Sequence, residues 1–312
     1  MRINELSYVA LVSRDVGRTA SLFGETLKLA RTDVSAGTGK VPAFSVGQTA
    51  IALFEPGHPF VDGEEKSGVH HFAFAVDDPE RASSFVSCRG FRRSADAIRA
   101  GLQDKPRAGI DASSTAGVKV FFQQALDIRR SPPGPIERID HLGIASADNR
   151  DAIGVFCDKL GLALESQQTD IETQLAIESF TSDKYGAIYH TRAPQIVGGL
   201  RVAFVTAGDC ELEFLQNFDP SQGGHVDRGS SGTTRQDQGA ITRYITSRGA
   251  GLHHLAFKTE DINGTLATLN DSGFVTIDKV GRPGSRRALI GFVQPKSLGG
   301  VLIHFVQRGE HP

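Results

Sequence analysis

Four polar side chains in the second half of the chain lie within apolar segments and are of types that bind metal ions. They are His141 in IDHLGIA, Glu213 in LEFLQ, His254 in GLHHLAF and His304 in VLIHFVQ. Histidine and glutamate are costly to bury unpaired, and three imidazoles with one carboxylate suit a divalent transition metal such as Zn, Fe, Mn, Co or Ni. If the four segments are strands of one curled sheet, the sequence predicts a site for one divalent metal ion on its inner face.

The histidine at position 254 belongs to a pair that recurs earlier in the chain. Residues 251–261 read GLHHLAFKTED, and residues 68–78 read GVHHFAFAVDD. Because the side chains of neighbouring strand residues point to opposite faces of a sheet, only one histidine of each pair is expected to face a shared cavity. We therefore predict that His254 faces inward and that His253 faces outward.

The paired motif is part of a longer repeat, in which a strand, a helix and further strands follow one another four times. Each expected helix begins after an aspartate that can cap its N-terminus, at positions 15, 78, 148 and 261. Corresponding positions are 50 residues apart in both halves, from 71 to 121 and from 254 to 304, and the linker-like sequence SPPGP at residues 131–135 separates the halves. The sequence thus predicts an α+β fold of four βαβββ modules, arranged as two domains at residues 1–130 and 136–309.

The first half has different residues at the positions that correspond to the four candidate ligands. They are Tyr8, Ala52, His71 and Phe121. Tyrosine, alanine and phenylalanine cannot replace the missing ligands, so we predict no metal ion in residues 1–130. We expect this domain to cover the second one or to shape the mouth of its pocket, and we expect His71 to be hydrogen-bonded.

Bulk properties exclude several classes of function. Hydrophobic residues make up 39% of the 312 residues, enough for ordinary cores, and the formal net charge is −2. This balance gives no electrostatic reason to expect nucleic acid or an anionic membrane as a partner, and the apolar runs are shorter than the roughly 20 residues of a membrane-spanning helix. Three scattered cysteines and an N-terminus without the pattern of a signal peptide are typical of a cytoplasmic protein. We expect a monomer or homodimer that binds a small molecule.

These motifs resemble those of the vicinal oxygen chelate superfamily, which includes glyoxalases, bleomycin-resistance proteins and type I extradiol dioxygenases. The second half is most similar to methylmalonyl-CoA epimerases, in the stretches at residues 139–145, 158–162, 212–216, 241–262 and 294–307. The resemblance implies two tandem glyoxalase-like domains, a degenerate one without metal and then a metal-binding one. It also implies that the four metal ligands fall on His141, Glu213, His254 and His304.

The resemblance further implies an activity, with two alternatives. Members of the superfamily chelate a substrate through vicinal oxygens, and the metal ion stabilises an enolate or oxyanion. The first expectation is therefore a metal-dependent isomerase, epimerase or lyase acting on a small carbonyl compound, acyl-CoA thioesters included. A two-domain layout with metal only in the second half is instead that of extradiol and 4-hydroxyphenylpyruvate dioxygenases, so the alternative is an Fe(II)-dependent extradiol-type dioxygenase. A non-catalytic small-molecule binding protein is the third reading.

Two departures from the epimerase pattern bear on this choice. The last ligand in the epimerases is normally glutamate, whereas this chain has His304. The epimerase base lies on the strand before Glu213, where this chain has Arg201, Val202 or Ala203. Because none of these side chains is suited to removing a proton from carbon, epimerisation of methylmalonyl-CoA is doubtful.

Residues outside the repeat supply weaker candidates for catalysis and binding. The second half contains long insertions that could fold over the cup, and their candidate acids or bases are His190, Tyr189, Glu178, Asp183 and His225. A basic cluster comprises Lys279, Arg282, Arg286, Arg287 and Lys296. Of these, Arg286 and Lys296 are candidates for binding the phosphate of a CoA-like substrate.

Overall fold

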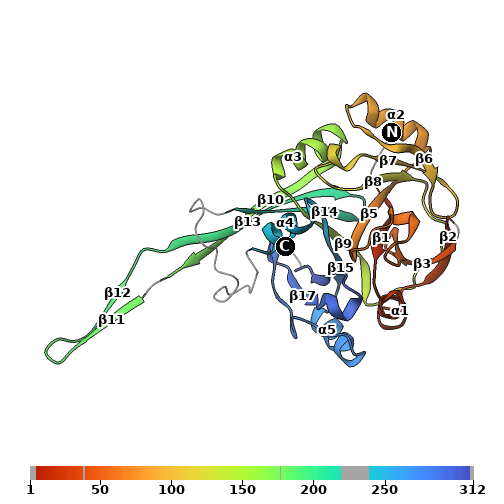
Figure 1. Cartoon of the computed structure of the whole chain (residues 1–312). Coiled ribbons are helices and arrows are strands. Elements are labelled where there is room, and N and C mark those ends of the chain that lie inside the picture. The colour runs from red at the N-terminus through yellow and green to blue at the C-terminus, as the bar shows by residue number, and fades with distance from the viewer. Residues whose placement is uncertain (1–4, 38, 176, 219–238, 310–312) are drawn as a thin grey trace.

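The computed structural model describes residues 5–37, 39–175, 177–218 and 239–309 (Figure 1). Two eight-stranded mixed sheets, each flanked by helices, form the body of the molecule, and a two-stranded hairpin extends from the second sheet. The two sheets have the same strand order, β2-β3-β4-β1-β5-β8-β7-β6 and β10-β13-β14-β9-β15-β18-β17-β16. The predicted α+β fold of two tandem domains is therefore confirmed.

The first domain contains eight strands and five short helices in the described residues. In chain order they are β1 (Leu6–Val12), α1 (Val16–Ser21), η1 (Leu22–Thr26), β2 (Arg31–Ala36), β3 (Gly39–Val46), β4 (Thr49–Phe54), η2 (Pro59–Val61), β5 (Gly68–Ala75), α2 (Pro79–Cys88), β6 (Arg93–Ala100), β7 (Pro106–Ile110), η3 (Ala112–Ser114) and β8 (Val120–Gln123). The boundary expected between residues 130 and 136 falls in a segment that is neither helix nor strand.

The second domain repeats this order and adds a long insertion. Its elements are β9 (Ile136–Ala145), α3 (Asn149–Ile153), η4 (Gly154–Lys159), β10 (Ala163–Gln174), β11 (Ile177–Ser182), β12 (Gly186–Thr191), β13 (Gln195–Ala207), β14 (Cys210–Phe218), α4 (Ala240–Arg248), β15 (Gly251–Thr259), α5 (Ile262–Asp271), β16 (Arg282–Pro283), η5 (Ser285–Arg287), β17 (Leu289–Val293), η6 (Pro295–Leu298) and β18 (Ile303–Gln307). None of the helices in the described ranges is long and apolar enough to cross a membrane.

The four expected aspartate caps are present. The side chains of Asp15, Asp78, Asp148 and Asp261 accept hydrogen bonds from backbone N–H groups in the first turn of α1, α2, α3 and α5. These bonds satisfy donors that have no partner within the helix. The same capping signal thus starts the helix of every module.

Strand register identifies the corresponding positions of the two domains. The pair Val9–Ile51 of the first sheet corresponds to the pair Leu142–Leu212 of the second. In the same way, the pair Ala10–His71 corresponds to Gly143–His254, and the pair Ala73–Phe121 corresponds to Ala256–His304. Tyr8, Ala52, His71 and Phe121 therefore occupy the places of His141, Glu213, His254 and His304, as the sequence repeat predicts.

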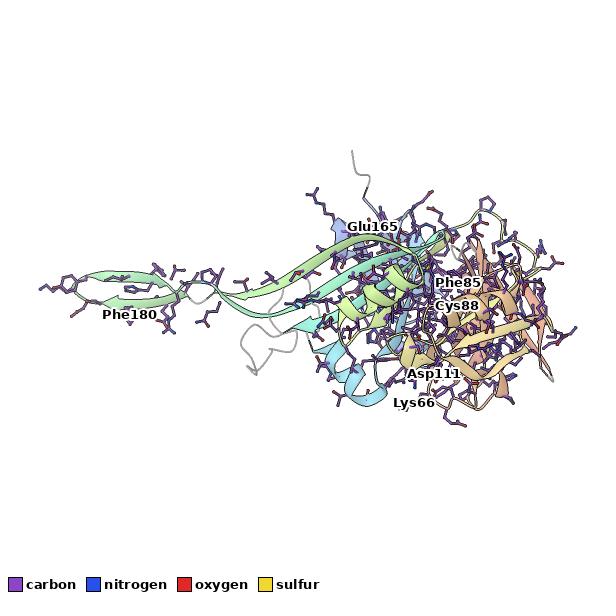
Figure 2. All side chains as sticks on the ribbon, turned by 90° about the horizontal axis from the view of Figure 1, so that it is seen from above. Lys66, Phe85, Cys88, Asp111, Glu165 and Phe180 are labelled. Carbon is purple, nitrogen blue, oxygen red and sulfur yellow. The ribbon has the colours of Figure 1, made fainter. Side chains whose placement is uncertain are left out.

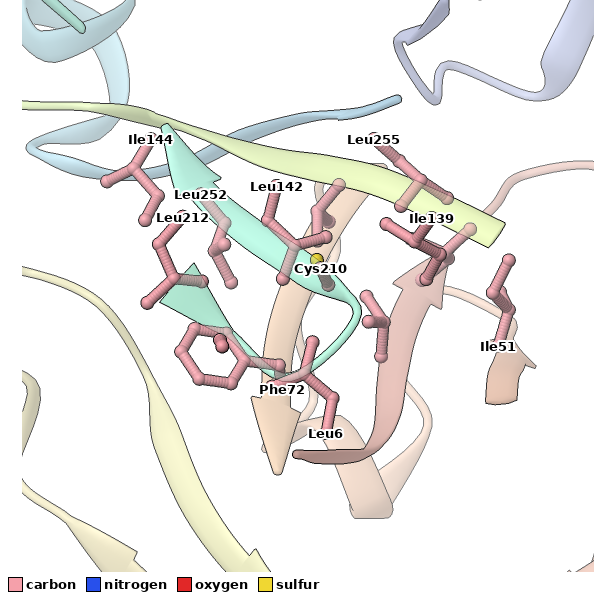
Figure 3. Close-up of a cluster of buried hydrophobic side chains, with 14 of the residues drawn as sticks. Leu6, Ile51, Phe72, Ile139, Leu142, Ile144, Cys210, Leu212, Leu252 and Leu255 are labelled. Atoms are coloured by element: carbon pink, nitrogen blue, oxygen red, sulfur yellow. The ribbon is translucent and has the colours of Figure 1, made fainter. Parts of the chain in front are cut away.

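One apolar core is shared by the two domains. Figure 3 shows Leu6, Ile51 and Phe72 of the first sheet gathered with Leu142, Ile144 and other apolar side chains of the second. Because Leu142 and Ile144 of β9 face this shared core, the opposite face of the same strand is left for the polar site. The metal-ligand candidates therefore lie on the face of the second sheet that turns away from the first domain.

The long insertion forms an arm that projects from the body. Strands β10 and β13 extend past the rest of the sheet, and β11 pairs with β12 beyond them. Figures 1 and 2 show the arm pointing away from both domains in two perpendicular views. The sequence left open that this insertion folds over the cup, and the arm instead points away from the cup of its own chain.

Candidate metal centre

Three buried imidazoles from three strands meet at the bottom of the second cup. They belong to His141 on β9, His254 on β15 and His304 on β18, and one ring nitrogen from each lies within 4.8 Å of the others. The Nε2 atoms of His141 and His254 are 3.3 Å apart. The histidines are 3–4% exposed, so water has little access to their nitrogens.

Glu213 on β14 lies beside two of these imidazoles. Its Oε2 atom is 3.2 Å from Nε2 of His141 and 3.5 Å from Nε2 of His254. Burial alone would raise the pKa of Glu213, but the neighbouring imidazoles outweigh it and hold that pKa well below its usual value. Burial likewise opposes protonation of His141, yet Glu213 and Asp140 together raise its pKa to about 9.

The third imidazole is the one whose surroundings fit a metal ion best. Both ring nitrogens of His304 are buried and have no hydrogen-bond partner. Burial and the nearby His254 and His141 lower the pKa of His304 well below the usual value, so the ring is neutral. A buried polar group without a partner is costly, and a divalent ion would provide one while accepting lone pairs from the other rings.

Asp140 fixes the orientation of the first ligand. It is fully buried, and its Oδ1 atom accepts a hydrogen bond from Nδ1 of His141 at 2.7 Å. Nε of Arg308 donates to Oδ2 of the same carboxylate at 3.0 Å. With Nδ1 carrying the proton, Nε2 of His141 presents a lone pair to the site, an arrangement common among metal-binding histidines.

A β-bulge explains why sequence reasoning missed Asp140. The pairing of β9 with β15 skips this residue between Ile139 and His141. Bulges re-aim side chains and are frequent beside active sites. Simple alternation places neighbours on opposite faces of the sheet, and it therefore gave no reason to place Asp140 next to the His141 ring.

A second bulge overturns the expectation for His253. The same pair of strands skips this residue between Leu252 and His254, and His253 lines the cavity instead of facing outward. Its Nδ1 atom is 3.0 Å from Nδ1 of His254, and its ring meets that of Tyr244 edge-on at 4.7 Å. If Nε2 of His254 binds a metal ion, Nδ1 of His254 must carry the proton and donate it to His253.

The candidate ligands form the floor of a largely apolar cavity of about 350 Å³. Its apolar walls include Leu200, Phe204, Leu215, Ile241, Ile277, Ile290, Phe292 and Val306. Two arginines also line it, and each is held by a carboxylate: Arg282 by Asp278, and Arg308 by Asp140. Among the described lining residues, Glu213 carries the sole carboxyl group.

The other candidate residues lie outside this cavity lining. Glu178, Asp183, Tyr189 and His190 are exposed on the arm, where Glu178 pairs with Arg192. Arg286 is bound by Glu211 and Glu165, and Lys296 is exposed in η6. His225 lies outside the described residues. Roles for these side chains in catalysis or phosphate binding stay predictions.

The first cup holds an arginine where the second gathers its imidazoles. The Nη1 atom of Arg107 lies 3.4 Å from both the Tyr8 hydroxyl and Nε2 of His71, and its Nη2 donates to the carbonyl of Phe60 at 2.9 Å. The guanidinium also stacks on the rings of Phe60 and Phe121 at 3.7 and 4.6 Å. His71 accepts or donates a hydrogen bond to Tyr8 at 3.1 Å, so its role here is hydrogen bonding.

Comparisons with known proteins agree with the architecture. Residues 140–292 match the family model of the Glyoxalase/Bleomycin resistance protein/Dioxygenase superfamily. A triple mutant of 4-hydroxymandelate synthase from Streptomyces coelicolor has the same fold over 100% of this chain and 94% of its own, with a TM-score of 0.65 and 16% identity.

Two shorter relatives match roughly half of the chain. Methylmalonyl-CoA epimerase from Mycobacterium tuberculosis is 22% identical, covering 57% of this chain and 93% of its own, with a TM-score of 0.40. An uncharacterised protein of Bacillus subtilis (strain 168), YqjC, is 25% identical over 172 residues, which are 55% of this chain and 93% of that protein.

Proposed function

Because residues 140–292 belong to the Glyoxalase/Bleomycin resistance protein/Dioxygenase superfamily, we propose that the protein is an Fe(II)-dependent dioxygenase. Its substrate is a small, apolar compound with two vicinal oxygens, such as a catechol or an aromatic 2-oxo acid. His141, His254 and His304 would bind the ion throughout, and Glu213 would be a fourth donor only in the resting site. The observation that carries the proposal is the meeting of three buried imidazoles on the floor of an apolar cavity.

The cavity walls favour oxygen chemistry over isomerisation. An isomerase or epimerase needs a side-chain base near the carbon that loses its proton. Strand β13, where the epimerases carry that base, contributes Leu200 and Phe204 to the cavity. Of the three positions considered from the sequence, Val202 and Ala203 are buried apolar residues and Arg201 is exposed. The likeness in fold to 4-hydroxymandelate synthase over the whole chain also supports an oxygenase.

The same walls favour an apolar substrate over a coenzyme A thioester. A phosphate group would need free cationic side chains, and Arg286 is already bound by two carboxylates while its guanidinium stacks on Phe204 at 3.7 Å. The cavity itself is lined mainly by aliphatic and aromatic groups, which suit an aromatic ring. A volume of about 350 Å³ is at the small end of ligand pockets.

The residues of this chain would orient the ligands and exclude water. Asp140 and Arg308 hold the His141 ring with Nε2 toward the site, and the Phe204 and Phe292 rings close its sides. When bound, a redox-active ion supplies Lewis acidity and electron transfer to dioxygen. The apolar walls raise the strength of every electrostatic interaction at that ion.

A metal-dependent isomerase or lyase acting on a small carbonyl compound is the second candidate. The position of Glu213 favours it, because four protein donors leave two positions of an octahedral ion. Two positions suffice for a chelating substrate but leave none for dioxygen. Dioxygenase activity therefore requires that one of the four side chains does not bind the ion during turnover. Glu213 is the candidate for this, because it is the carboxylate among three imidazoles.

Elemental analysis followed by oxygen-uptake measurements tests the proposal. Protein loaded anaerobically with Fe(II) should consume O2 with a catechol or 2-oxo acid, and His304→Ala should abolish uptake and metal binding. His71→Gln, at the position corresponding to His254, serves as the matched control and should keep both. Metal-dependent proton exchange without O2 uptake would instead establish the isomerase, and metal-free protein that binds a ligand tightly would establish a binding protein.

A further inference from the structure

Two exposed apolar surfaces lie on this chain, and the residues that the structure describes cover neither of them. The first is the arm, comprising residues 171–175 and 177–195, on which Ile177, Phe180, Ile188 and Tyr189 are 45–73% exposed. The second, which we call the rim, comprises Val275, Ile277 and Val280, which are 50–65% exposed. In the part of the chain that the structure describes, the other large apolar side chains more than a third exposed lie in the arm or near the rim, apart from Ile98 and Leu164.

The arm is not a stable element by itself. Strands β11 and β12 form a separate two-stranded sheet, and their side chains are exposed on both faces. An isolated hairpin of this kind is at best marginally stable in water and needs a further strand or a packed face. Figure 2 labels Phe180 at a distance from the body, where its ring contacts that of His190 on the paired strand β12.

The rim lies at the mouth of the proposed active site. Ile277 lines the cavity that contains the three imidazoles, and the segment that carries it is tied to β17 by the bond from the Ile277 N–H to the Phe292 carbonyl. The rim is therefore held in place but remains open to solvent. The arm of the same chain points away from it in both views (Figures 1 and 2).

We propose that two copies of this chain form a two-fold dimer in which the arm of each copy covers the rim and cavity mouth of the other. A second copy is favoured as the occupant because the two surfaces would then cover each other reciprocally. A two-fold arrangement also doubles the area that one arm would bury on a different protein, because two arms and two rims are covered at once. Stable specific interfaces bury on the order of 1,600 Å² in total, which favours the arrangement that covers both pairs of surfaces.

The charges on the arm agree with such a partner. The sequence of the arm has three acidic residues, Glu172, Glu178 and Asp183, and two basic ones, Lys184 and Arg192, so its formal net charge is −1; Glu178 is paired with Arg192. So small a net charge gives no attraction to nucleic acid or to a strongly charged protein. Its aromatic and aliphatic side chains match the apolar rim instead, which is the composition found at the centre of interfaces.

The dimer would complete the site in trans. Glu178 on β11 and His190 on β12 are directly paired and share a face of the hairpin with Phe180 and Ile188, whereas Tyr189 lies on the other face. With the first face on the partner copy, Glu178 and His190 would reach its cavity mouth, exclude water and add to the polar groups of that cavity. This inference rests on the cavity and the two surfaces, and it holds whichever reaction the metal centre catalyses.

Disulfide trapping tests the contact directly. In a Cys88→Ser background, which removes the exposed native thiol, His190→Cys protein, with its cysteine on the face of Phe180 and Ile188, is mixed with Ile277→Cys protein and mildly oxidised. A covalent heterodimer is expected, because the arm of one copy meets the rim of the other. Covalent dimers of His190→Cys alone, without heterodimer, would show arm–arm pairing and overturn the proposal.

Sedimentation analysis provides the second readout. The wild-type chain should sediment as a dimer, and Phe180→Asp with Ile188→Asp on the arm should raise the dimer dissociation constant at least about 100-fold, equivalent to about 2.7 kcal/mol. Ile277→Asp on the rim should do the same, while Ile98→Asp, an exposed control in the first domain, should leave the dimer intact. A monomeric wild type, or arm variants that remain dimeric, would overturn the proposal. Metal content should be unchanged in the arm variants and in Ile98→Asp, which lie outside the cavity lining, so failure of the dimer is distinguishable from failure of the proposed function.

Discussion

Gly143 on β9 is the position at which the smallest substitution should disable the metal centre. A Cβ atom added there would lie 2.0 Å from Cε1 of His254 and 2.3 Å from both ring nitrogens. Carbon atoms in contact are normally about 3.5 Å apart, so the ring must retreat by about 1.5 Å. The backbone cannot give way instead, because β9 is paired on both sides, with β14 and β15.

The size of this displacement sets the expected effect of Gly143→Ala. Metal–ligand distances tolerate changes of about 0.2 Å, so a shift of about 1.5 Å removes His254 from the coordination sphere. We expect the affinity for the metal ion to fall at least about 100-fold, beyond the loss typical of supporting residues. The added methyl group should also lower the free energy of unfolding by about 1–3 kcal/mol through overpacking. The loss stays within this range because the His254 ring can move toward the cavity.

Competition with a chromophoric chelator measures the affinity, and urea unfolding of the metal-free protein measures the stability. Ala10→Gly is the matched control, since register places Ala10 at the corresponding position of the first domain. It should leave metal affinity unchanged. A Gly143→Ala protein that binds metal with wild-type affinity and an unchanged number of nitrogen ligands in X-ray absorption would refute ligation by His254 in the position described.

Three further predictions follow from the buried polar groups. Asp140→Asn should lower metal affinity about 10- to 100-fold, measured by the same competition assay, because the charged acceptor for Nδ1 of His141 is lost. Arg107→Met should lower the free energy of unfolding by about 2–4 kcal/mol in urea without changing metal content, since the Phe60 carbonyl and the aromatic faces lose their partner. The metal-free protein should lose stability as the pH falls below about 6.5. Burial and the neighbouring Lys119 lower the pKa of His70 in the folded protein to about 3, so between these two pH values only the unfolded chain takes up the proton. The free energy of unfolding should then fall by up to about 1.4 kcal/mol per pH unit.

Each of these has a result that would contradict it. Wild-type affinity in Asp140→Asn would mean that Arg308 or the strand positions the His141 ring by itself. An Arg107→Met protein as stable as the wild type would mean that the first cup does not need its cation. For His70, a free energy of unfolding that stays constant between pH 7 and pH 5 would show that the ring gains its proton without loss of the fold.

The repeated unit and the meeting of the imidazoles could be predicted from the sequence for one physical reason. In the second half, side chains that are costly to bury lie within apolar strands, and the 50-residue spacing between two of these positions recurs in the first half. Strand periodicity then determines which positions share a face of the sheet. The register of the two sheets accordingly matches Tyr8 with His141 and Phe121 with His304, as the repeat indicated. The aspartate that precedes the first helix of each module likewise marked where that helix begins.

What the sequence did not provide were the places where periodicity is broken. The bulges at Asp140 and His253 put neighbouring side chains on the same side of β9 and β15, and nothing in IDHLGIA or GLHHLAF marks an extra residue. The arm was also missed, because a polar insertion predicts a loop and says nothing about its direction. The positions of the bulges depend on how β9 pairs with β15, which is far away in the sequence. The direction of the arm depends on where β10 and β13 leave the sheet. A local sequence pattern encodes neither.

The duplicated fold provides two solutions to one electrostatic problem. A cup of apolar strands with polar groups at its floor needs a cation or hydrogen-bond donor there. The first domain supplies it from its own chain, with Arg107 at the position that Ile290 occupies in the second. The second domain keeps an aliphatic side chain at that place and leaves both nitrogens of His304 without a partner in the protein. The first floor therefore has its positive charge from Arg107. On the proposed function, the second floor would take its cation from solution instead, and that exchangeable ion would be the group that chelates a substrate.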